Sequence, residues 1–338
     1  MPSSHRTRLR PASRMALVAI AAAAAIGLAG CSSAAAPAAS PSATAEATSV
    51  TVTDNHGEQT VALPAQRVVA TDNRTISVLD SWGIDVVAAP LDIFPAGLSY
   101  KKDGSGVINL GNHGEPDLEA VVAADPDLII NGQRFASHYA SLQTLAPNAT
   151  IIELDPREGE DFGDELKRQV TVLGEVFGKQ DEAAKLVADY DESVERVKKA
   201  YDGQSVMGVI TSGGEINYAA PSTGRTLGPV FDILALTPAL SSDGSTDHQG
   251  DDISVEAIAA SNPEWILVMD RDAGVSANTD EEYTPAADLL TSSAVLKNVP
   301  AVKNGHIVYM PAGTYLDEGI VTYTTFFNSL ADALESAS

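Results

Sequence analysis

Apolar residues recur at helical intervals over residues 179–202, near the middle of the 338-residue chain. The intervals are four, four, three and four, the period of one helical face, and charged residues fill the other faces. The apolar residues are Leu186, Tyr190, Val194, Val197 and Tyr201. Gly178 and Gly203 bracket the segment as helix breakers. The pattern predicts one continuous helix of about 22 residues, roughly 33 Å long at about 1.5 Å per residue.

Two similar segments lie on either side of this helix. Residues 118–134 read LEAVVAADPDLIINGQR, and residues 255–271 read VEAIAASNPEWILVMDR. In each, a glutamate is followed seven residues later by a proline and fifteen residues later by an arginine. The matched pairs are Glu119 with Arg134 and Glu256 with Arg271. Two similar halves around a central helix indicate a two-lobed binding protein.

Short apolar runs typical of strands alternate with helical segments in both halves. In the first half we expect a hairpin around 55–57, strands at 67–70, 85–89, 128–130 and 151–154, and helices at 75–81, 117–124 and 166–177. In the second half we expect strands at 205–211, 265–270 and 306–310, and helices at 226–236, 254–260 and 319–336. The prediction is an α/β protein whose two lobes, 50–178 and 203–338, have central, mostly parallel sheets and are joined by the single long helix 179–202.

The first 30 residues have the pattern of a secretory signal peptide, a basic start followed by a short apolar run. The run ends in Leu28-Ala29-Gly30-Cys31, which resembles a bacterial lipobox. That resemblance implies cleavage before Cys31 and attachment of a diacylglyceryl group to its sulfur. Cys31 is the only cysteine, so internal disulfides are excluded. An ordinary buried cysteine is the alternative, but nothing around Cys31 could fold over it.

Residues 31–49 are interpreted as the lipidated cysteine and a flexible tether. Residues 32–49 are rich in Ser, Ala, Pro and Thr, without an apolar period, and cannot bury enough surface to order themselves. As a flexible coil, these 18 residues would span about 25 Å. We therefore expect a soluble body that a lipid anchor holds at the extracytoplasmic face of the cell membrane.

The expected body is strongly acidic. The chain has 21 Lys and Arg against 46 Asp and Glu, and four of the arginines lie in the first 30 residues, which contain no acid. The remainder therefore carries a net charge of −29. Such a surface repels nucleic acid and anionic lipid, and it makes each remaining cation informative.

Three of these cations are candidates for a ligand site. Arg134 and Arg271 directly follow predicted strands, and Arg225 follows the loop YAAPSTG on the same side. Ligands of open α/β sheets bind beyond the carboxyl ends of the strands, so the three guanidinium groups should meet in one cleft. Together they indicate an anionic ligand with planar, oxygen-rich groups. The alternative is a local ion pair for each arginine, for example with Asp270 or Asp272, but the matched repeat positions favour the cleft.

The lipobox, the tether, the two α/β halves and the connecting helix together resemble the substrate-binding lipoproteins of iron–siderophore ABC importers, over residues 50–338. The arginine segments are most similar to the catecholate branch, with its enterobactin-type and petrobactin-type receptors. These segments are NGQR ending at Arg134, GRTLG around Arg225, and VMDR ending at Arg271. The resemblance implies the helical-backbone (class III) periplasmic-binding-protein fold. It also implies a ferric siderophore as transported ligand and no permanently bound cofactor.

The resemblance further implies two residues that reach the metal, His248 and the tyrosine of the pair Tyr315-Leu316. Fe(III) is a hard ion that prefers oxygen ligands in octahedral geometry. A tetradentate bis-catecholate leaves two positions open, which a tyrosinate oxygen and an imidazole nitrogen could close. A tris-catecholate would leave them no metal site. Taken alone, His248 is better interpreted as a surface-loop histidine, and Tyr315 could equally be a core residue; together with the arginines they are interpreted as ligands.

Glu119 and Glu256 each begin the predicted helix of their repeat, so both should lie on the cleft-side rim, one per lobe. In the resembled class, glutamates in such L-E and S-x-E positions dock into arginine pockets of the permease dimer, which works with an ATPase. The alternative is that these are ordinary acids at helix starts, which the helix dipole favours.

The sequence contains no nucleophile elbow, Walker loop, dinucleotide fingerprint or H-E-x-x-H motif, which argues against an enzyme on this scaffold. A purely structural lipoprotein would not need matched arginines. We expect a monomeric receptor that binds a ferric catecholate siderophore in the inter-lobe cleft and delivers it to an ABC permease for iron uptake. A receptor of the same class for a hydroxamate siderophore, haem or cobalamin is the alternative. It predicts a more aromatic, less Arg-rich cleft, and aromatic residues make up 5% of the chain.

Overall fold

The two similar segments fold into the same unit twice in the computed structural model, which describes residues 48–279 and 281–337. In the first unit, helix α2 (Leu118–Ala124) leads into strand β6 (Leu128–Asn131); in the second, α7 (Val255–Ser261) leads into β11 (Trp265–Asp270). Each helix starts with a capping side chain and ends at a residue in the left-handed region, after which a proline precedes the strand. The caps are Asp117 and Ser254, and the left-handed residues are Asp125 and Asn262.

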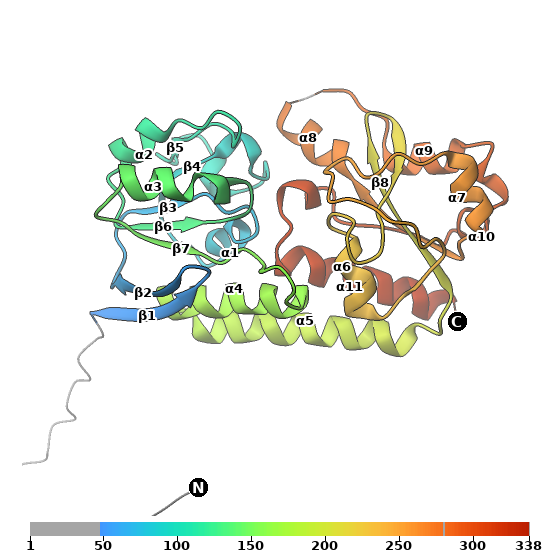
Figure 1. The fold of residues 1–338 in the computed structure, drawn as a ribbon, viewed down its shortest axis with the longest axis horizontal. Helices are drawn as coiled ribbons and strands as arrows, with labels where there is room; N and C mark the ends of the chain where they lie inside the picture. Colours follow the sequence, from blue (N-terminus) through green and yellow to red (C-terminus); the bar gives the residue numbers. More distant parts are fainter. Residues whose placement is uncertain (1–47, 280, 338) are drawn as a thin grey trace, which may run out of the picture. The chain divides into compact units, whose positions relative to one another are not determined.

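The two main sheets, one in each half of Figure 1, are built alike: in each, the first strand lies inside the sheet with later strands parallel on both sides. The N-terminal sheet runs β5-β4-β3-β6-β7 and the C-terminal sheet β10-β8-β11-β12, with all of these neighbours parallel. The N-terminal strands are β3 (Val68–Ala70), β4 (Val86–Ala89), β5 (Ile108–Asn109), β6 and β7 (Thr150–Glu153). The C-terminal strands are β8 (Ser205–Ser212), β10 (Thr237–Pro238), β11 and β12 (Ile307–Tyr309), with β9 (Glu215–Tyr218) antiparallel to β8. A separate hairpin joins β1 (Ser49–Asp54) to β2 (Gly57–Ala62).

Three helices form a layer that serves both halves of the chain. In Figure 1, α4 (Phe162–Phe177) and α5 (Gln180–Ala200) run beneath the sheets, and α11 (Ile320–Ala337) packs along α5. A single hydrophobic core contains Leu166 of α4, Tyr190 of α5 and Phe327 of α11, and it continues into the C-terminal sheet. The long helix is therefore one member of a packed layer, because its apolar stripe is covered by neighbouring helices.

The remaining helices cover the sheets or connect strands. They are α1 (Ile76–Ser81), α3 (Tyr139–Leu145), α6 (Gly228–Leu234), α8 (Arg271–Thr279), α9 (Ala286–Ser292) and α10 (Pro300–Asn304), with short 3-10 turns at 91–93, 99–101, 133–138, 296–298 and 314–316. None of the helices in the described residues is long and apolar enough to span a membrane.

The two halves touch directly where the start of α1 meets the start of α11. The Asn73 side chain donates to the carbonyl of Leu316 at 3.0 Å, and the Ser77 hydroxyl donates to Asp317 at 2.6 Å. Gly319 lies against the backbone of Arg74 so closely that a Cβ atom there would sit 2.1 Å from the Arg74 carbonyl oxygen. These contacts hold the C-terminal end of the N-terminal strands against the beginning of α11.

The predicted α/β class with mostly parallel sheets is confirmed, but one expected element is shorter than predicted. The helix expected over 226–236 begins only at Gly228, because Thr226 has φ +64° and cannot continue a right-handed helix. The predicted signal peptide, Cys31 and most of the tether, up to residue 47, lie outside the described residues.

Candidate functional site

A cavity of about 550 Å³ lies between the two halves. Its lining consists of Arg74, His113, Gln133, Arg134, Asp155, Arg225, His248, Arg271 and Tyr315. The five residues predicted to hold the ligand or reach its metal therefore line one cavity. Another cavity, of about 500 Å³, lies on the N-terminal half around Leu63 and Phe177 and contains none of them.

Strand ends position three of the four cavity arginines. Arg74 follows β3, Arg134 follows β6, and Arg271 follows β11 as the first residue of α8. β3 and β6 are parallel neighbours, so their carboxyl ends bring the first two arginines to the same edge of the sheet. Arg225 comes instead from the loop that precedes α6.

The ring of Tyr315 lies among three guanidinium groups. The guanidinium carbons of Arg134, Arg271 and Arg225 are 4.6, 4.8 and 5.4 Å from its centroid, within the range of cation–π contact. The Tyr315 side chain is buried, yet it lines the cavity, so it is a core residue and a cavity residue at once. The imidazole of His248 is 6.4 Å from the Tyr315 ring, centroid to centroid.

The local ion pairs considered from the sequence are present for some arginines and absent for one. Arg271 lies 3.4 Å from Asp272, and Arg225 lies 3.0 Å from Glu318. Arg134 donates to the backbone carbonyl of Tyr315 at 3.1 Å, its buried Nε has no partner, and no carboxylate of the described residues pairs with it. Cavity lining and local pairing are thus compatible, and Arg134 carries the least compensated charge.

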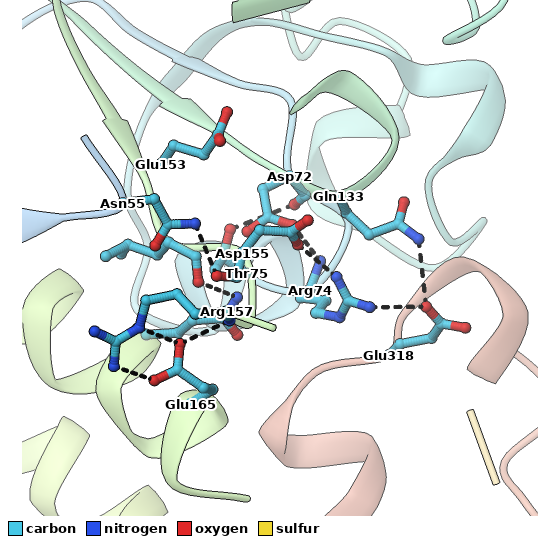
Figure 2. Close-up of polar contacts among 12 residues, drawn as sticks. Asn55, Asp72, Arg74, Thr75, Gln133, Glu153, Asp155, Arg157, Glu165 and Glu318 are labelled. Carbon is cyan, nitrogen blue, oxygen red and sulfur yellow. Dashed lines mark hydrogen bonds and ion pairs between the residues drawn. The ribbon is translucent and has the colours of Figure 1, made fainter. Parts of the chain in front are cut away.

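A polar network joins the floor of the cavity to the N-terminal hairpin (Figure 2). Arg74 pairs with Asp155 at 2.6 Å and reaches Glu318 of the C-terminal half at 3.6 Å. Gln133 donates to the same Glu318 carboxylate at 3.4 Å. On the far side, Asn55 donates to the carbonyl of Asp155 at 2.9 Å. The carboxylate of Glu318 is therefore one of the points at which the two halves contact each other, next to the cavity residues Arg74 and Gln133.

The buried acids of this network have opposite pKa shifts. Burial alone would raise the pKa of Glu318, but Arg225 and Arg74 hold it at about 2, so this carboxylate is ionised at neutral pH. Burial and the neighbouring Asp155 raise the pKa of Asp72 to about 7. Asp72 lies behind Arg74, whose backbone N–H it accepts at 2.9 Å, and its other oxygen is buried without a partner.

The imidazoles of the cavity are held neutral. Burial lowers the pKa of His113, as do Arg134 and His138, and burial together with Arg271 lowers the pKa of His248. A neutral imidazole keeps a nitrogen lone pair, which is the form that ligates metals. His113 comes from the N-terminal half and His248 from the C-terminal half, so the cavity has an imidazole on each side.

We expect Asp72→Asn to flatten the pH dependence of stability. A carboxyl whose pKa is raised in the folded state binds more protons when folded, so its ionisation costs stability as the pH rises from about 4 to about 7. Asparagine can still accept the Arg74 N–H but cannot ionise. In denaturant unfolding, the variant should gain on the order of 2 kcal/mol relative to the parent chain at pH 8 and little at pH 4.

The control is Asp103→Asn, which changes an exposed carboxyl in the same way. It should shift the free energy of unfolding equally at both pH values. An equal shift for Asp72→Asn would show that the Asp72 carboxyl does not titrate as the geometry implies.

The sequence analysis did not identify four cavity residues, or Glu318, which contacts two of them. Arg74 follows β3 much as Arg134 follows β6, so the strand-end rule could have found it. His113 and Asp155 lie in loops, and Gln133 begins a 3-10 turn. Glu318 acts through contacts with residues 74, 133 and 225. No local sequence pattern predicts such long-range contacts.

Glu119 and Glu256 do not line the cavity. Both are exposed in the first turns of α2 and α7, and neither side chain makes an ion pair or hydrogen bond within the described residues. The fold therefore leaves both carboxylates free for an external partner. It also repeats their placement, one on each equivalent helix.

A family model described as periplasmic binding protein matches residues 68–314. The chain belongs to this family. Periplasmic binding proteins are substrate-binding proteins and not enzymes, and the predicted family, fold and non-enzymatic class are confirmed.

Characterised members of the periplasmic binding protein family are similar over most of their length. Petrobactin-binding protein YclQ of Bacillus subtilis is 28% identical over 83% of this chain and 86% of its own. Ferric-anguibactin-binding protein FatB of Vibrio anguillarum is 27% identical over 79% of this chain and 81% of its own.

Two solved structures are also similar to this chain over nearly their whole length. The crystal structure of YclQ covers 85% of this chain and 99% of its own, at 27% identity and a TM-score of 0.71. The catecholate-siderophore binding protein VctP of Vibrio cholerae covers 86% and 100%, at 25% identity and a TM-score of 0.70.

Proposed function

We propose that this protein is an extracytoplasmic lipoprotein that binds a ferric catecholate siderophore in the inter-lobe cavity and delivers it to an ABC permease for iron uptake. The observation that carries the proposal is the convergence of four arginines on one cavity in a chain of net charge −25. Cations are scarce elsewhere, so a cavity that gathers them is suited to an anion. The names of the similar proteins YclQ and VctP support the siderophore class.

The cavity arginines are assigned to the catecholate oxygens. Guanidinium groups keep their charge at any relevant pH and donate in a planar fork, which matches the two oxygens of a catecholate. Arg134, Arg225 and Arg271 surround Tyr315, so a planar ring that enters beside this tyrosine can stack against them.

Tyr315 and His248 are assigned to the iron of a tetradentate siderophore. Two catecholates leave two positions of octahedral Fe(III) open. The Tyr315 phenol lies among three guanidinium groups, and burial and Arg271 lower the pKa of the neighbouring His248, which favours its unprotonated imidazole. The pair therefore offers one hard oxygen and one nitrogen beside the anion-binding arginines.

Delivery and anchoring complete the proposal. Glu119 and Glu256, free and exposed on equivalent helices, are proposed to dock into arginine pockets of the permease dimer. Cys31 is proposed to carry the lipid that holds the monomeric receptor at the extracytoplasmic face of the membrane. Iron enters and leaves as the transported ferric siderophore.

Calorimetric titration of the full chain in detergent micelles tests the ligand class, with ferric bis-catecholate, ferric tris-catecholate, ferrioxamine and haem as probes. Calorimetry is preferable to tryptophan fluorescence because neither Trp82 nor Trp265 lines the cavity. We expect a nanomolar Kd for a ferric catecholate and much weaker binding of ferrioxamine and haem. Selective binding of ferrioxamine or haem would leave the family assignment standing and discard the catecholate proposal.

A further inference from the structure

Glu318 is a buried carboxylate that two of the cavity arginines share. Its side chain is 5% exposed, and it accepts from Arg225 Nε at 3.0 Å and Arg225 Nη2 at 3.2 Å. Arg74 of the N-terminal half lies 3.6 Å away, and Gln133 donates at 3.4 Å. The Thr226 hydroxyl donates at 2.7 Å. A carboxylate with this many donors is fixed in place beneath the cavity.

The carboxylates beside the cavity nearly balance its cations. Four guanidinium groups line it, those of Arg74, Arg134, Arg225 and Arg271. Three carboxylates pair with them: Asp155 with Arg74, Asp272 with Arg271, and Glu318 with both Arg225 and Arg74. The surplus is about one positive charge, centred on Arg134. Asp72 is not counted, because it accepts the backbone N–H of Arg74 and makes no ion pair with a cavity arginine within the described residues.

We propose that Glu318 sets the net charge of the ligand that the cavity accepts, so that a ferric complex with a single negative charge binds better than one with three. The proposal rests on the proposed function and narrows it to the bis-catecholate class. Fe(III) with two doubly deprotonated catecholates carries a single negative charge, and with three it carries three. With the Tyr315 phenol counted as neutral, the first matches the surplus of the cavity. If Tyr315 binds the iron as a phenolate, one negative charge is left over, against two for the tris-catecholate.

The physical reason is the cost of unmatched charge in a partly enclosed site. A ligand with three negative charges would leave two uncompensated in the cavity, and removing charge from water is costly unless it is paired. Glu318 also takes two of the five N–H donors of Arg225, so this arginine can offer the ligand only the two of Nη1 and the second one of Nη2. Glu318 is thus a positioning residue that withholds cationic charge from the ligand.

The residue after Arg225, Thr226, has a strained backbone, which indicates that the surrounding contacts fix this part of the site. Thr226 is β-branched and has φ +64°, a conformation that such residues rarely adopt. Its hydroxyl donates to Glu318, and its carbonyl accepts from the buried hydroxyl of Tyr323 at 2.8 Å. Strained residues persist where the surroundings over-determine them, and they cluster at binding sites. The bonds to Glu318 and Tyr323 hold this strained backbone in place, directly after Arg225.

The wild-type chain gives the first test, by calorimetry with the full chain in detergent micelles at neutral pH. We expect ferric bis-catecholate to bind at least tenfold more tightly than ferric tris-catecholate built from the same catechol. Equal or tighter binding of the tris-catecholate would overturn the proposal. Binding of neither complex would instead defeat the proposed function itself, so the two failures are distinguishable.

Three variants give the second test, in which the ratio of the two Kd values is the readout. Glu318→Gln removes the charge and keeps the shape, and it should move the ratio toward the tris-catecholate by about tenfold, or ~1.4 kcal/mol. Glu318→Asp keeps the charge and should keep the wild-type ratio even if both affinities fall. Asp317→Asn alters the neighbouring buried acid, which bonds to Ser77 rather than to an arginine, and should also keep the ratio.

If Glu318 has only a structural role, Glu318→Gln should weaken binding of both ferric complexes equally and leave the ratio of the two Kd values unchanged. That result would contradict the proposal. If Glu318→Gln does not fold, the wild-type ratio and the Glu318→Asp ratio still decide. A tris-catecholate preference in either protein contradicts the assigned charge class.

Discussion

Replacing Arg134 with alanine is expected to weaken binding of ferric bis-catecholate by about 100-fold, ~2.7 kcal/mol. The Arg134 guanidinium stacks 4.6 Å from the Tyr315 ring and pairs with no carboxylate of the described residues. Its charge is therefore the one that an anionic ligand meets uncompensated. Truncating one partner of a desolvated charge pair costs about 2–5 kcal/mol, since the other charge is left unpaired.

The matched control is Arg196→Ala, which removes the same formal charge from α5. Arg196 is half-buried and pairs with Asp332 at 2.7 Å and Glu335 at 3.0 Å on α11, away from the cavity lining. Its removal should leave the Kd within about twofold, because a surface ion pair is worth only ~1 kcal/mol to stability and nothing to the site. If Arg134→Ala binds as tightly as Arg196→Ala, the arginine cavity is not the catecholate site.

Replacing Gly319 with alanine is expected to destabilise the fold by about 3 kcal/mol and to lower the unfolding midpoint by roughly 6–10 °C. The new Cβ would lie 2.1 Å from the carbonyl oxygen of Arg74, which is backbone and cannot swing away. The start of α11 must then move off the N-terminal half. That movement would also stretch the Arg74–Glu318 pair at the floor of the cavity.

Gly313→Ala is the control for this change. Gly313 lies six residues earlier, has no neighbour within 4 Å of the added Cβ, and has φ −81°. Thermal unfolding of this variant should lie within about 2 °C of the parent chain, as surface substitutions usually change stability by under ~0.5 kcal/mol. Equal midpoints for the two variants would show that the halves do not depend on close packing at Gly319.

Much of the fold could be predicted from the sequence, because the repeated helix–strand unit is determined by residues close to one another in the chain. The caps Asp117 and Ser254, the breaks before Pro126 and Pro263, and the buried runs of β6 and β11 act within about ten residues of one another. The rule that ligands bind beyond the carboxyl ends of parallel strands then predicted that Arg134 and Arg271 line one cavity, as they do in the structure.

The remainder of the site depends on contacts that sequence patterns do not encode. Glu318 precedes the last helix, and nothing near it in the sequence indicates partners at residues 74, 133 and 225. Threonine favours an extended or helical backbone. The left-handed conformation of Thr226 therefore reflects its tertiary hydrogen bonds with Glu318 and Tyr323. The role of Arg225 as a restrained cation is likewise visible only in three dimensions.

The layer of α4, α5 and α11 limits how this architecture can be recombined. Because one apolar core runs from α4 through α5 and α11 into the C-terminal sheet, the two halves are not interchangeable modules. A chimera that exchanged residues 203–338, including α11, with those of a relative would set a foreign α11 against a native α5 and leave gaps or clashes between them. New ligand specificities in such a scaffold are therefore reached by changing the loops and strand ends around the cavity, while the helices beneath are inherited together.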